Sequence, residues 1–204
     1  MLRDGLRNLL AKSPEIDVVG TAANGSEALD LLADTGADLV FMDIQMPVMN
    51  GIEATRRIRE AFPDTKVLAL TMIDETDTLT DMMEAGARGY LLKDAKKSEL
   101  VEAALAVANG GLYFCTRANP KVLELLTRSR MPALPRLQPD LFSEKELRII
   151  ELLCKEYSSK QIAPEVGLTE YTVEAYRKKI MVKMGVQNIA GLVVWAVKNG
   201  MVTV

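Results

Sequence analysis

Short apolar runs alternate with amphipathic segments through the first half of the chain, and this alternation restricts the fold more than any other feature. Strand-like runs lie at residues 16–21, 38–43, 66–71 and 89–93. Helical periodicity is found between and after them, at residues 26–33, 52–61, 76–85 and 97–109. Near-continuous apolar strands separated by helices indicate a parallel sheet that is covered on both faces. The sequence therefore predicts a doubly wound α/β domain.

The second half has helical patterning without strand-like runs. Four candidate helix N-caps are Ser143, Ser158, Thr169 and Asn188. The first two have Glu or Gln three residues later, which is the spacing of a capping box. A short helix, the turn at 167–169 and a longer basic helix to about Met184 are the components of a helix-turn-helix. This half is predicted to be an all-α four-helix domain.

A proline-rich stretch and a change of charge separate the two halves. Residues 131–139 contain three prolines, which remove backbone donors and disfavour helix, so they are typical of a linker. Residues 1–112 carry 11 Lys and Arg against 19 Asp and Glu, a balance that repels nucleic acid. We expect a first domain at 1–112, a linker at 113–139 with one helix at about 120–130, and a second domain at 140–204.

The composition excludes several classes of chemistry. The chain has no histidine, so Ser-His-Asp and Cys-His catalysis, histidine metal ligands and phosphohistidine within the chain are excluded. Cys115 and Cys154 lie far apart in apolar segments and are expected to be free thiols of a reducing compartment. No apolar run approaches the roughly 20 residues of a membrane span, and no signal peptide is evident. These features predict a cytoplasmic protein without membrane contact.

Three polar side chains stand at the carboxyl ends of predicted strands. They are Asp43, Thr71 and Lys93. Parallel sheets place ligand chemistry at these strand ends. A carboxylate there can act as a nucleophile toward a phosphoryl group, while an ammonium and a hydroxyl hold the phosphoryl oxygens. Each residue alone fits a helix cap or a solvated strand end, but the three together favour a phosphoryl site.

The motifs around these residues resemble the receiver domain of bacterial two-component response regulators. They are DIQMPVMNG at 43–51, LT at 70–71 and GYLLKD at 89–94, and the resemblance covers residues 1–112. It implies a flavodoxin-like fold with strand order 2-1-3-4-5. It also implies that a partner histidine kinase switches the protein by phosphorylation.

The resemblance assigns roles to individual residues. Asp43 would accept the phosphoryl group, Thr71 would move onto it, and Lys93 would pair with it. Tyr90 matches an aromatic residue whose ring turns inward on activation. Asp43 and the backbone carbonyl of Gln45 match ligands of Mg²⁺.

One part of the family pattern is missing. In the family, a strand ending in two acidic residues precedes the helix that residues 1–10 resemble, and Asp4 does not match that pair. Hard cations need several oxygen ligands, so we expect Mg²⁺ binding to be weak or absent and phosphorylation to be poor. The absent strand is also expected to leave an apolar slot, so that 16–21 must detach, pair directly with 38–43, or find a strand from another chain.

Two explanations of this departure stay open, and each implies a function. We favour a chain shortened at its N-terminus. The alternative is a degenerate receiver that works without phosphate, as a dimerisation scaffold for a transcription factor. An enzyme with an aspartyl nucleophile, such as a phosphatase, is disfavoured because no second carboxylate near Asp43 is available as acid or base, so we do not expect an enzyme.

The second half resembles the LuxR-type (NarL/FixJ-type) DNA-binding domain over residues 140–204. The motifs are FSxxE at 142–146, SKQIA at 159–163, LTxxTVE at 168–174 and KMGV at 183–186. The resemblance implies that the third helix enters the major groove of double-stranded DNA. It also implies a homodimer, although the apolar face at 189–197 fits the core of the domain better.

The positions of the resemblance select candidate DNA contacts. Base-facing residues would be Glu174, Ala175 and Lys178. Candidates for phosphate contacts are Lys160, Thr172, Arg177, Lys179 and Lys183. A single basic residue fits a solvated surface equally well, whereas the cluster after a turn of this length favours DNA. Because Glu174 would repel phosphates, it should weaken binding unless it finds a donor.

Overall fold

The computed structural model describes residues 2–72, 76–115 and 142–202, which fall into two units. The described part of the first unit is 2–72 and 76–115 and that of the second is 142–202, and each is described by itself. The helix predicted at about 120–130 lies outside the described residues. The predicted domain boundaries stay predictions.

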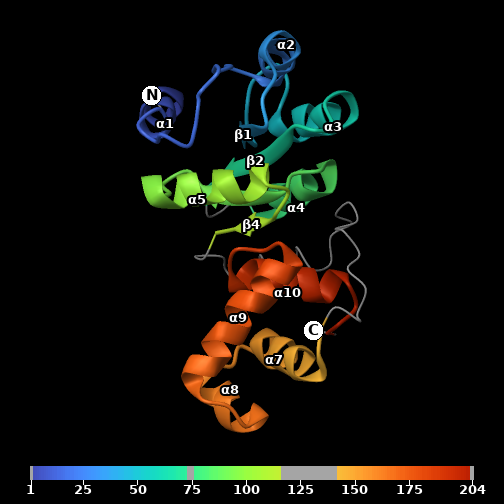
Figure 1. Ribbon diagram of the computed structural model, residues 1–204. Helices are drawn as coiled ribbons and strands as arrows, with labels where there is room; N and C mark the ends of the chain where they lie inside the picture. Colours follow the sequence, from blue (N-terminus) through green and yellow to red (C-terminus); the bar gives the residue numbers. More distant parts are fainter. Residues whose placement is uncertain (1, 73–75, 116–141, 203–204) are drawn as a thin grey trace. The chain divides into compact units, whose positions relative to one another are not determined.

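The first unit is built around a parallel sheet with the strand order β1-β2-β3-β4 (Figure 1). The strands are β1 (Leu39–Asp43), β2 (Lys66–Thr71), β3 (Gly89–Leu92) and β4 (Tyr113–Phe114). The first three match predicted strands. The short β4 was not predicted, and it forms the start of the segment that the sequence assigned to the linker. In β2 every residue after Lys66 is buried, as expected for a strand covered on both faces.

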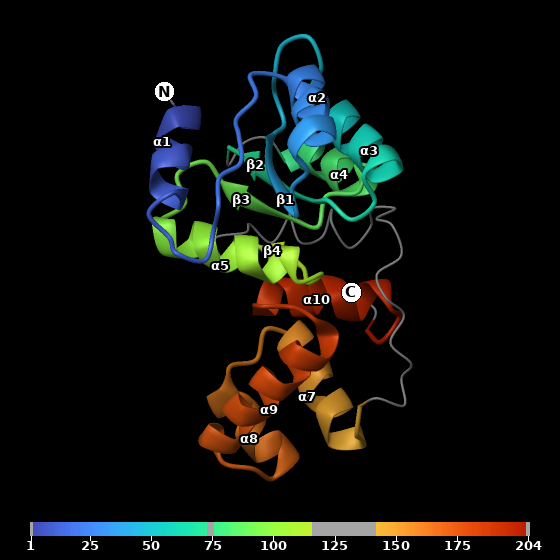
Figure 2. The same ribbon diagram turned by 45° about the horizontal axis from the view of Figure 1, so that its top comes forward.

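Helices cover both faces of this sheet (Figure 2). One face carries α1 (Leu2–Leu10) and α5 (Lys97–Ala108), which contact each other. The other carries α2 (Gly25–Thr35), α3 (Gly51–Ala61) and α4 (Thr76–Ala85). The doubly wound parallel architecture is therefore confirmed.

Residues 16–21 are not a strand, so this prediction was wrong. The segment has no regular secondary structure, although Ile16 and Val18 pack against the core cluster that contains Leu10. A strand persists only where its backbone pairs with a neighbour, and no neighbouring strand reaches this segment in the described part of the chain. The predicted direct pairing of 16–21 with 38–43 is not observed, and the segment is detached from the sheet.

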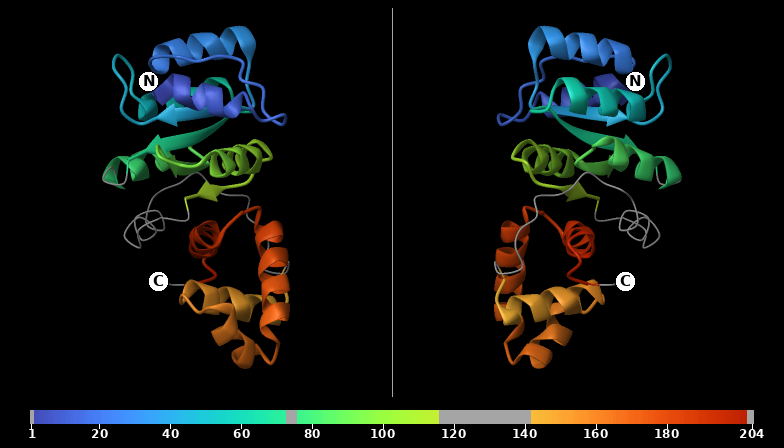
Figure 3. Two further views of the ribbon diagram at one scale, coloured as in Figure 1. Left: turned by 90° about the vertical axis from the view of Figure 1, so that its left-hand side faces the viewer. Right: turned by 90° about the vertical axis from the view of Figure 1, so that its right-hand side faces the viewer.

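The second unit contains the four predicted helices (Figure 3). They are α7 (Glu144–Cys154), α8 (Ser159–Val166), α9 (Glu170–Met184) and α10 (Ile189–Lys198). All four predicted N-caps accept a bond from a backbone N–H in the first turn, and both capping boxes are present. Gly167 ends α8 with φ 65°, a left-handed conformation that favours glycine and allows the tight turn into α9.

The core of the second unit forms around Trp195, the single tryptophan of the chain. Its ring meets Phe142 edge to face, with 5.9 Å between the ring centroids. Leu192, Val194 and Ala196 of α10 are buried as well, so this apolar face lies in the core of its own domain. No helix among the described residues of either unit has the length and apolar character to cross a membrane.

Candidate functional site

The carboxyl edge of the sheet brings three predicted residues together. Asp43 ends β1, Thr71 ends β2, and Lys93 directly follows β3. The Lys93 ammonium lies 2.8 Å from Oδ1 of Asp43, and both side chains are partly exposed. The backbone N–H of Lys93 donates to the carbonyl of Thr71 at 2.9 Å, which fixes the relative position of the two strand ends. The edge therefore holds a carboxylate, an ammonium and a hydroxyl. Solvent can reach the Asp43 carboxylate, because its side chain is partly exposed.

The loop after Asp43 is tightly folded, and Gly51 allows it to close. A Cβ atom at Gly51 would lie 2.0 Å from the backbone oxygen of Asp43, so another residue would displace the loop. The Gly51 N–H donates to the Ile44 carbonyl at 2.9 Å. The backbone N–H of Gln45 donates to Oδ1 of Asp43 at 3.1 Å. These contacts orient the carboxylate toward the edge where Lys93 meets it.

Thr71 and Tyr90 lie deeper in the unit. Thr71 is buried, and its hydroxyl donates to the Met72 carbonyl at 3.0 Å. Tyr90 is also buried, with its ring edge to face against Phe114. Burial raises the pKa of the Tyr90 hydroxyl, and the nearby Cys115 thiol adds to the increase. The Tyr90 ring is therefore buried, and its predicted part in the switch stays a prediction.

The donor set does not fit a tight Mg²⁺ site. Asp43 is the one carboxylate of the predicted set, and its Oδ1 already accepts from Lys93 and Gln45. Among the residues that the structure describes, no group of three Asp, Glu, Cys or His side chains is placed to hold a metal ion. Mg²⁺ demands near-octahedral oxygen coordination. The weak magnesium binding expected from the sequence stays a prediction.

The predicted DNA contacts in the second unit differ in accessibility. Lys160, Ala175, Lys178 and Lys179 are exposed, whereas Thr172, Glu174, Arg177 and Lys183 are partly buried. The exposed lysines lie on α8 and on the middle of α9, as a phosphate-facing surface requires. The partly buried charged residues form ion pairs within the unit, and the exposed Lys179 ammonium also lies 3.5 Å from Oε1 of Glu146.

Glu174 has hydrogen-bond donors, without which it was expected to weaken DNA binding. Its Oε1 accepts from the Ser159 hydroxyl and, at 2.5 Å, from Nη1 of Arg177. The same Nη1 donates to the Ser159 oxygen at 2.7 Å. The Ser159 bond lowers the pKa of Glu174, burial opposes it, and the Arg177 charge lowers it further. In the free domain the Arg177 charge is therefore neutralised by Glu174.

Lys183 is paired with a carboxylate that sequence analysis recognised only as part of a helix cap. Its ammonium lies 2.8 and 2.7 Å from the two carboxylate oxygens of Glu146, which is 2% exposed. The ammonium also lies 5.4 Å from the centroid of the Phe142 ring. Burial raises the pKa of Glu146, but bonds from Lys183 and the Ser143 N–H outweigh it and hold the pKa at about 2.

Tyr171 was not among the residues predicted to contact DNA. Its side chain is 86% exposed in the first turn of α9, two residues after the Thr169 N-cap. Because the N-terminal residues of a recognition helix contact base edges in helix-turn-helix proteins, Tyr171 is a further candidate for a DNA contact. The sequence signal that could have identified Tyr171 was its position in the first helical turn after the capping residue Thr169.

Comparisons with known proteins agree with both resemblances. Residues 1–105 match the family described as response regulator receiver domain, and residues 140–196 match bacterial regulatory proteins of the luxR family. The chain is 31% identical to the transcriptional regulatory protein DegU of Brevibacillus brevis, over 100% of this chain and 92% of that protein. It is 33% identical to the oxygen regulatory protein NreC of Staphylococcus aureus, over 98% and 93% respectively.

A solved structure shows the same likeness. The crystal structure of a LuxR-family two-component response regulator from Aurantimonas sp. is 35% identical, with a TM-score of 0.52. The match covers 60% of this chain and 85% of that one.

Proposed function

Because the chain belongs to the LuxR-type response regulators, DNA-binding transcriptional regulators of two-component systems, we propose that Asp43 is its phosphoacceptor. The observation that carries this proposal is the 2.8 Å contact between the Lys93 ammonium and the Asp43 carboxylate at the carboxyl edge of the sheet. The phosphoryl donor would be a phosphohistidine of a partner kinase, since this chain has no histidine.

The residues around Asp43 support a phosphorylation switch. An Asp43 oxygen attacks the phosphorus, the bond to the kinase imidazole breaks, and an acyl phosphate results. Lys93 then exchanges its contact with the carboxylate for one with a phosphoryl oxygen. The Thr71 hydroxyl leaves the Met72 carbonyl to donate to another phosphoryl oxygen. This movement shifts an existing equilibrium of the domain surface, with Tyr90 held inward.

The rival function is that of a phosphate-independent scaffold. It is supported by the single carboxylate at the site and by the ion pair that already occupies it. Beryllofluoride with Mg²⁺, a mimic of the acyl phosphate, separates the two. A change in dimerisation or in DNA affinity of the wild-type chain supports the switch. An unchanged DNA affinity and an unchanged oligomer mass support the scaffold.

For the output domain, we propose that α9 enters the major groove of double-stranded DNA, in a homodimer with one domain per half-site. Glu174, Ala175 and Lys178 would face bases. Phosphate contacts would come from Lys160, Thr172, Arg177, Lys179 and Lys183. The exposed positions of Lys160 and Lys178 support this arrangement, whereas Arg177, Lys179 and Lys183 would have to leave their carboxylate partners.

Lys178→Ala is expected to weaken DNA binding. A base-facing lysine contributes about 1–3 kcal/mol to discrimination, so the affinity for the operator should fall about tenfold or more. The measurement is fluorescence anisotropy with operator and with random DNA over a salt series. Lys145→Ala, an exposed lysine on α7, is the matched control and should change neither affinity. An equal loss on both DNAs would instead make Lys178 a phosphate contact.

Glu174→Gln is expected to strengthen binding to random DNA. The substitution removes the negative charge that neutralises Arg177 and frees the guanidinium for a phosphate. The slope of log affinity against log salt should steepen by about 1. Glu170→Gln, an exposed carboxylate in the first turn of the same helix, is the control. If both variants change the slope equally, the effect is one of net charge and Arg177 is not released.

A further inference from the structure

Three side chains join α8 and α9 through hydrogen bonds. The Ser159 hydroxyl, in the first residue of α8, donates to Oε1 of Glu174 on α9. Nη1 of Arg177, one turn further along α9, donates to the same Oε1 at 2.5 Å and to the Ser159 oxygen at 2.7 Å. Ser159 is buried, with 5% of its surface exposed. The Glu174 carboxylate is therefore tied to the neighbouring helix through one of its two oxygens.

The second carboxylate oxygen of Glu174 is not used by this cluster. The two hydrogen bonds and the ion pair all end on Oε1. Among the residues that the structure describes, no donor bonds to Oε2, and the Glu174 side chain is 46% exposed. A buried hydroxyl thus holds one oxygen of a half-exposed carboxylate and leaves the other available.

Glu174 shares a face of α9 with exposed side chains. Tyr171 lies three residues before it and Lys178 four residues after it, and both are exposed. Residues three and four positions apart are neighbours on a helix surface, so the three side chains form one stripe. Ala175, also exposed, lies next to this stripe. Glu174 is therefore an acceptor on the face of α9 that carries the proposed base contacts.

The chemistry of an ionised carboxylate selects one base. The Ser159 bond and the charges of Arg177 and Lys178 lower the pKa of Glu174, so the side chain is ionised at neutral pH and can only accept. Guanine O6 and N7 and thymine O4 are acceptors and repel it. Adenine offers its N6 amino group, but the N7 acceptor lies beside that group. Cytosine presents the N4 amino group without an acceptor in the major groove, so it is the base that matches.

The bond from Ser159 reduces the entropy cost of such a contact. A glutamate side chain in solvent has many rotamers, and it loses them when it binds. In this domain Oε1 is already fixed before DNA arrives, so only Oε2 has to meet its partner. The Ser159 hydroxyl donates directly to Glu174, so this bond remains if the Arg177 guanidinium moves to a phosphate.

We propose that Ser159 is a positioning residue for base readout. Its hydroxyl holds Oε1 of Glu174 so that Oε2 accepts from N4 of a cytosine in the operator. The proposal rests on the proposed entry of α9 into the major groove. It adds the base that Glu174 reads and the residue of α8 that fixes the reading side chain.

The base is tested with duplex DNA and the full chain. Selection from a randomised duplex library gives the operator, and fluorescence anisotropy then measures single replacements. At one position in each half-site we expect cytosine, with binding about tenfold weaker when thymine replaces it. Deoxyzebularine, which is cytosine without the N4 amino group, should cause the same loss.

Glu174→Ala should bind the cytosine and deoxyzebularine duplexes equally. The ratio of the two affinities is the readout, because it cancels the change in phosphate attraction that follows the loss of a negative charge. A Glu174→Ala variant that still prefers cytosine about tenfold would overturn the proposal.

Ser159→Ala tests the anchor. We expect the preference for cytosine to fall from about tenfold to nearly none, while the preference at the position that depends on Lys178 stays unchanged. Ser159→Thr keeps the hydroxyl and should restore the preference. Urea unfolding followed by Trp195 fluorescence ensures that folded variants are compared. A uniform loss at every position, or an unchanged preference for cytosine, would contradict the positioning role.

Lys178→Ala separates this proposal from the proposed function. If a base preference depends on Lys178 but none depends on Glu174, α9 enters the groove and the Ser159 proposal alone is overturned. If neither variant changes any base preference, the entry of α9 into the groove is wrong and both proposals are overturned.

Discussion

Asp43→Asn is expected to abolish phosphorylation of the protein. Asparagine keeps the shape of the side chain but removes the carboxylate nucleophile, so neither acetyl phosphate nor a kinase can form an acyl phosphate at this position. The mass increase of one phosphoryl group, measured on the intact chain, should disappear completely. The response of DNA affinity to acetyl phosphate should disappear with it.

Asp38→Asn is the matched control for this experiment. Asp38 is an exposed carboxylate that directly precedes the same strand, at the opposite end from Asp43. This variant should be phosphorylated like the wild type. If the Asp43 variant still gains the mass of a phosphoryl group, another residue is the acceptor. If the wild type gains none, the scaffold function is favoured.

Glu146→Gln is expected to destabilise the second unit by about 3 kcal/mol at neutral pH. The estimate follows from a pKa of about 2 in the folded state against an ordinary value of 4.5. Glutamine retains the capping-box spacing, so the loss reports the negative charge that Lys183, the Ser143 N–H and Lys179 stabilise. Urea unfolding followed by Trp195 fluorescence measures this unit, because Trp195 is the single tryptophan and is buried there. Glu144→Gln, an exposed neighbour in the same helix, should change the stability little.

The same ion pair predicts a pH dependence. The folded-state pKa of Glu146 is lowered, so its stabilisation is fully present above about pH 4.5 and is lost as the pH falls toward 2. The wild type and the Gln variant should therefore differ in unfolding free energy at pH 7 and converge near pH 2. A constant difference across this range would show that the ionised carboxylate is not the source of the stability.

Local patterns in the sequence were sufficient to predict most of the helices and strands. Ser143 and Ser158 were recognisable as caps because capping depends on residues three positions apart. β1, β2 and β3 were recognisable because their apolar runs are nearly continuous, as is typical of strands in a parallel sheet that helices cover on both faces. The short β4 had no such signal, since two residues carry no periodicity.

The candidate sites were predictable in part. Asp43, Thr71 and Lys93 could be brought together from sequence because the carboxyl ends of parallel strands share one edge. The partners of Arg177 and Lys183 could not be predicted in this way. Glu146 lies 37 residues before Lys183, and no local spacing signals that their helices cross at this point.

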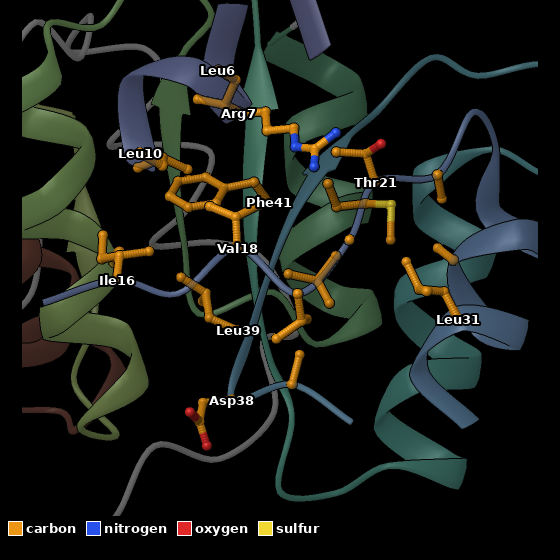
Figure 4. A pocket seen from close by; sticks show the side chains of 18 of the residues that line it. Leu6, Arg7, Leu10, Ile16, Val18, Thr21, Leu31, Asp38, Leu39 and Phe41 are labelled. Carbon is orange, nitrogen blue, oxygen red and sulfur yellow. The ribbon is translucent and has the colours of Figure 1, made fainter. Parts of the chain in front are cut away.

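Short-range patterns thus predicted most of the secondary structure and the residues at the sheet edge, and the receiver and luxR-family matches agree with the predicted order of the two domains. Only the three-dimensional packing decided which cations face solvent and which are neutralised, because charge pairing depends on helices distant in the chain. It also decided that residues 16–21 detach and that the predicted apolar slot beside β1, with a volume of about 560 Å³, is present (Figure 4). An apolar run encodes the tendency to form a strand, but a strand forms only where a neighbouring backbone completes its hydrogen bonds.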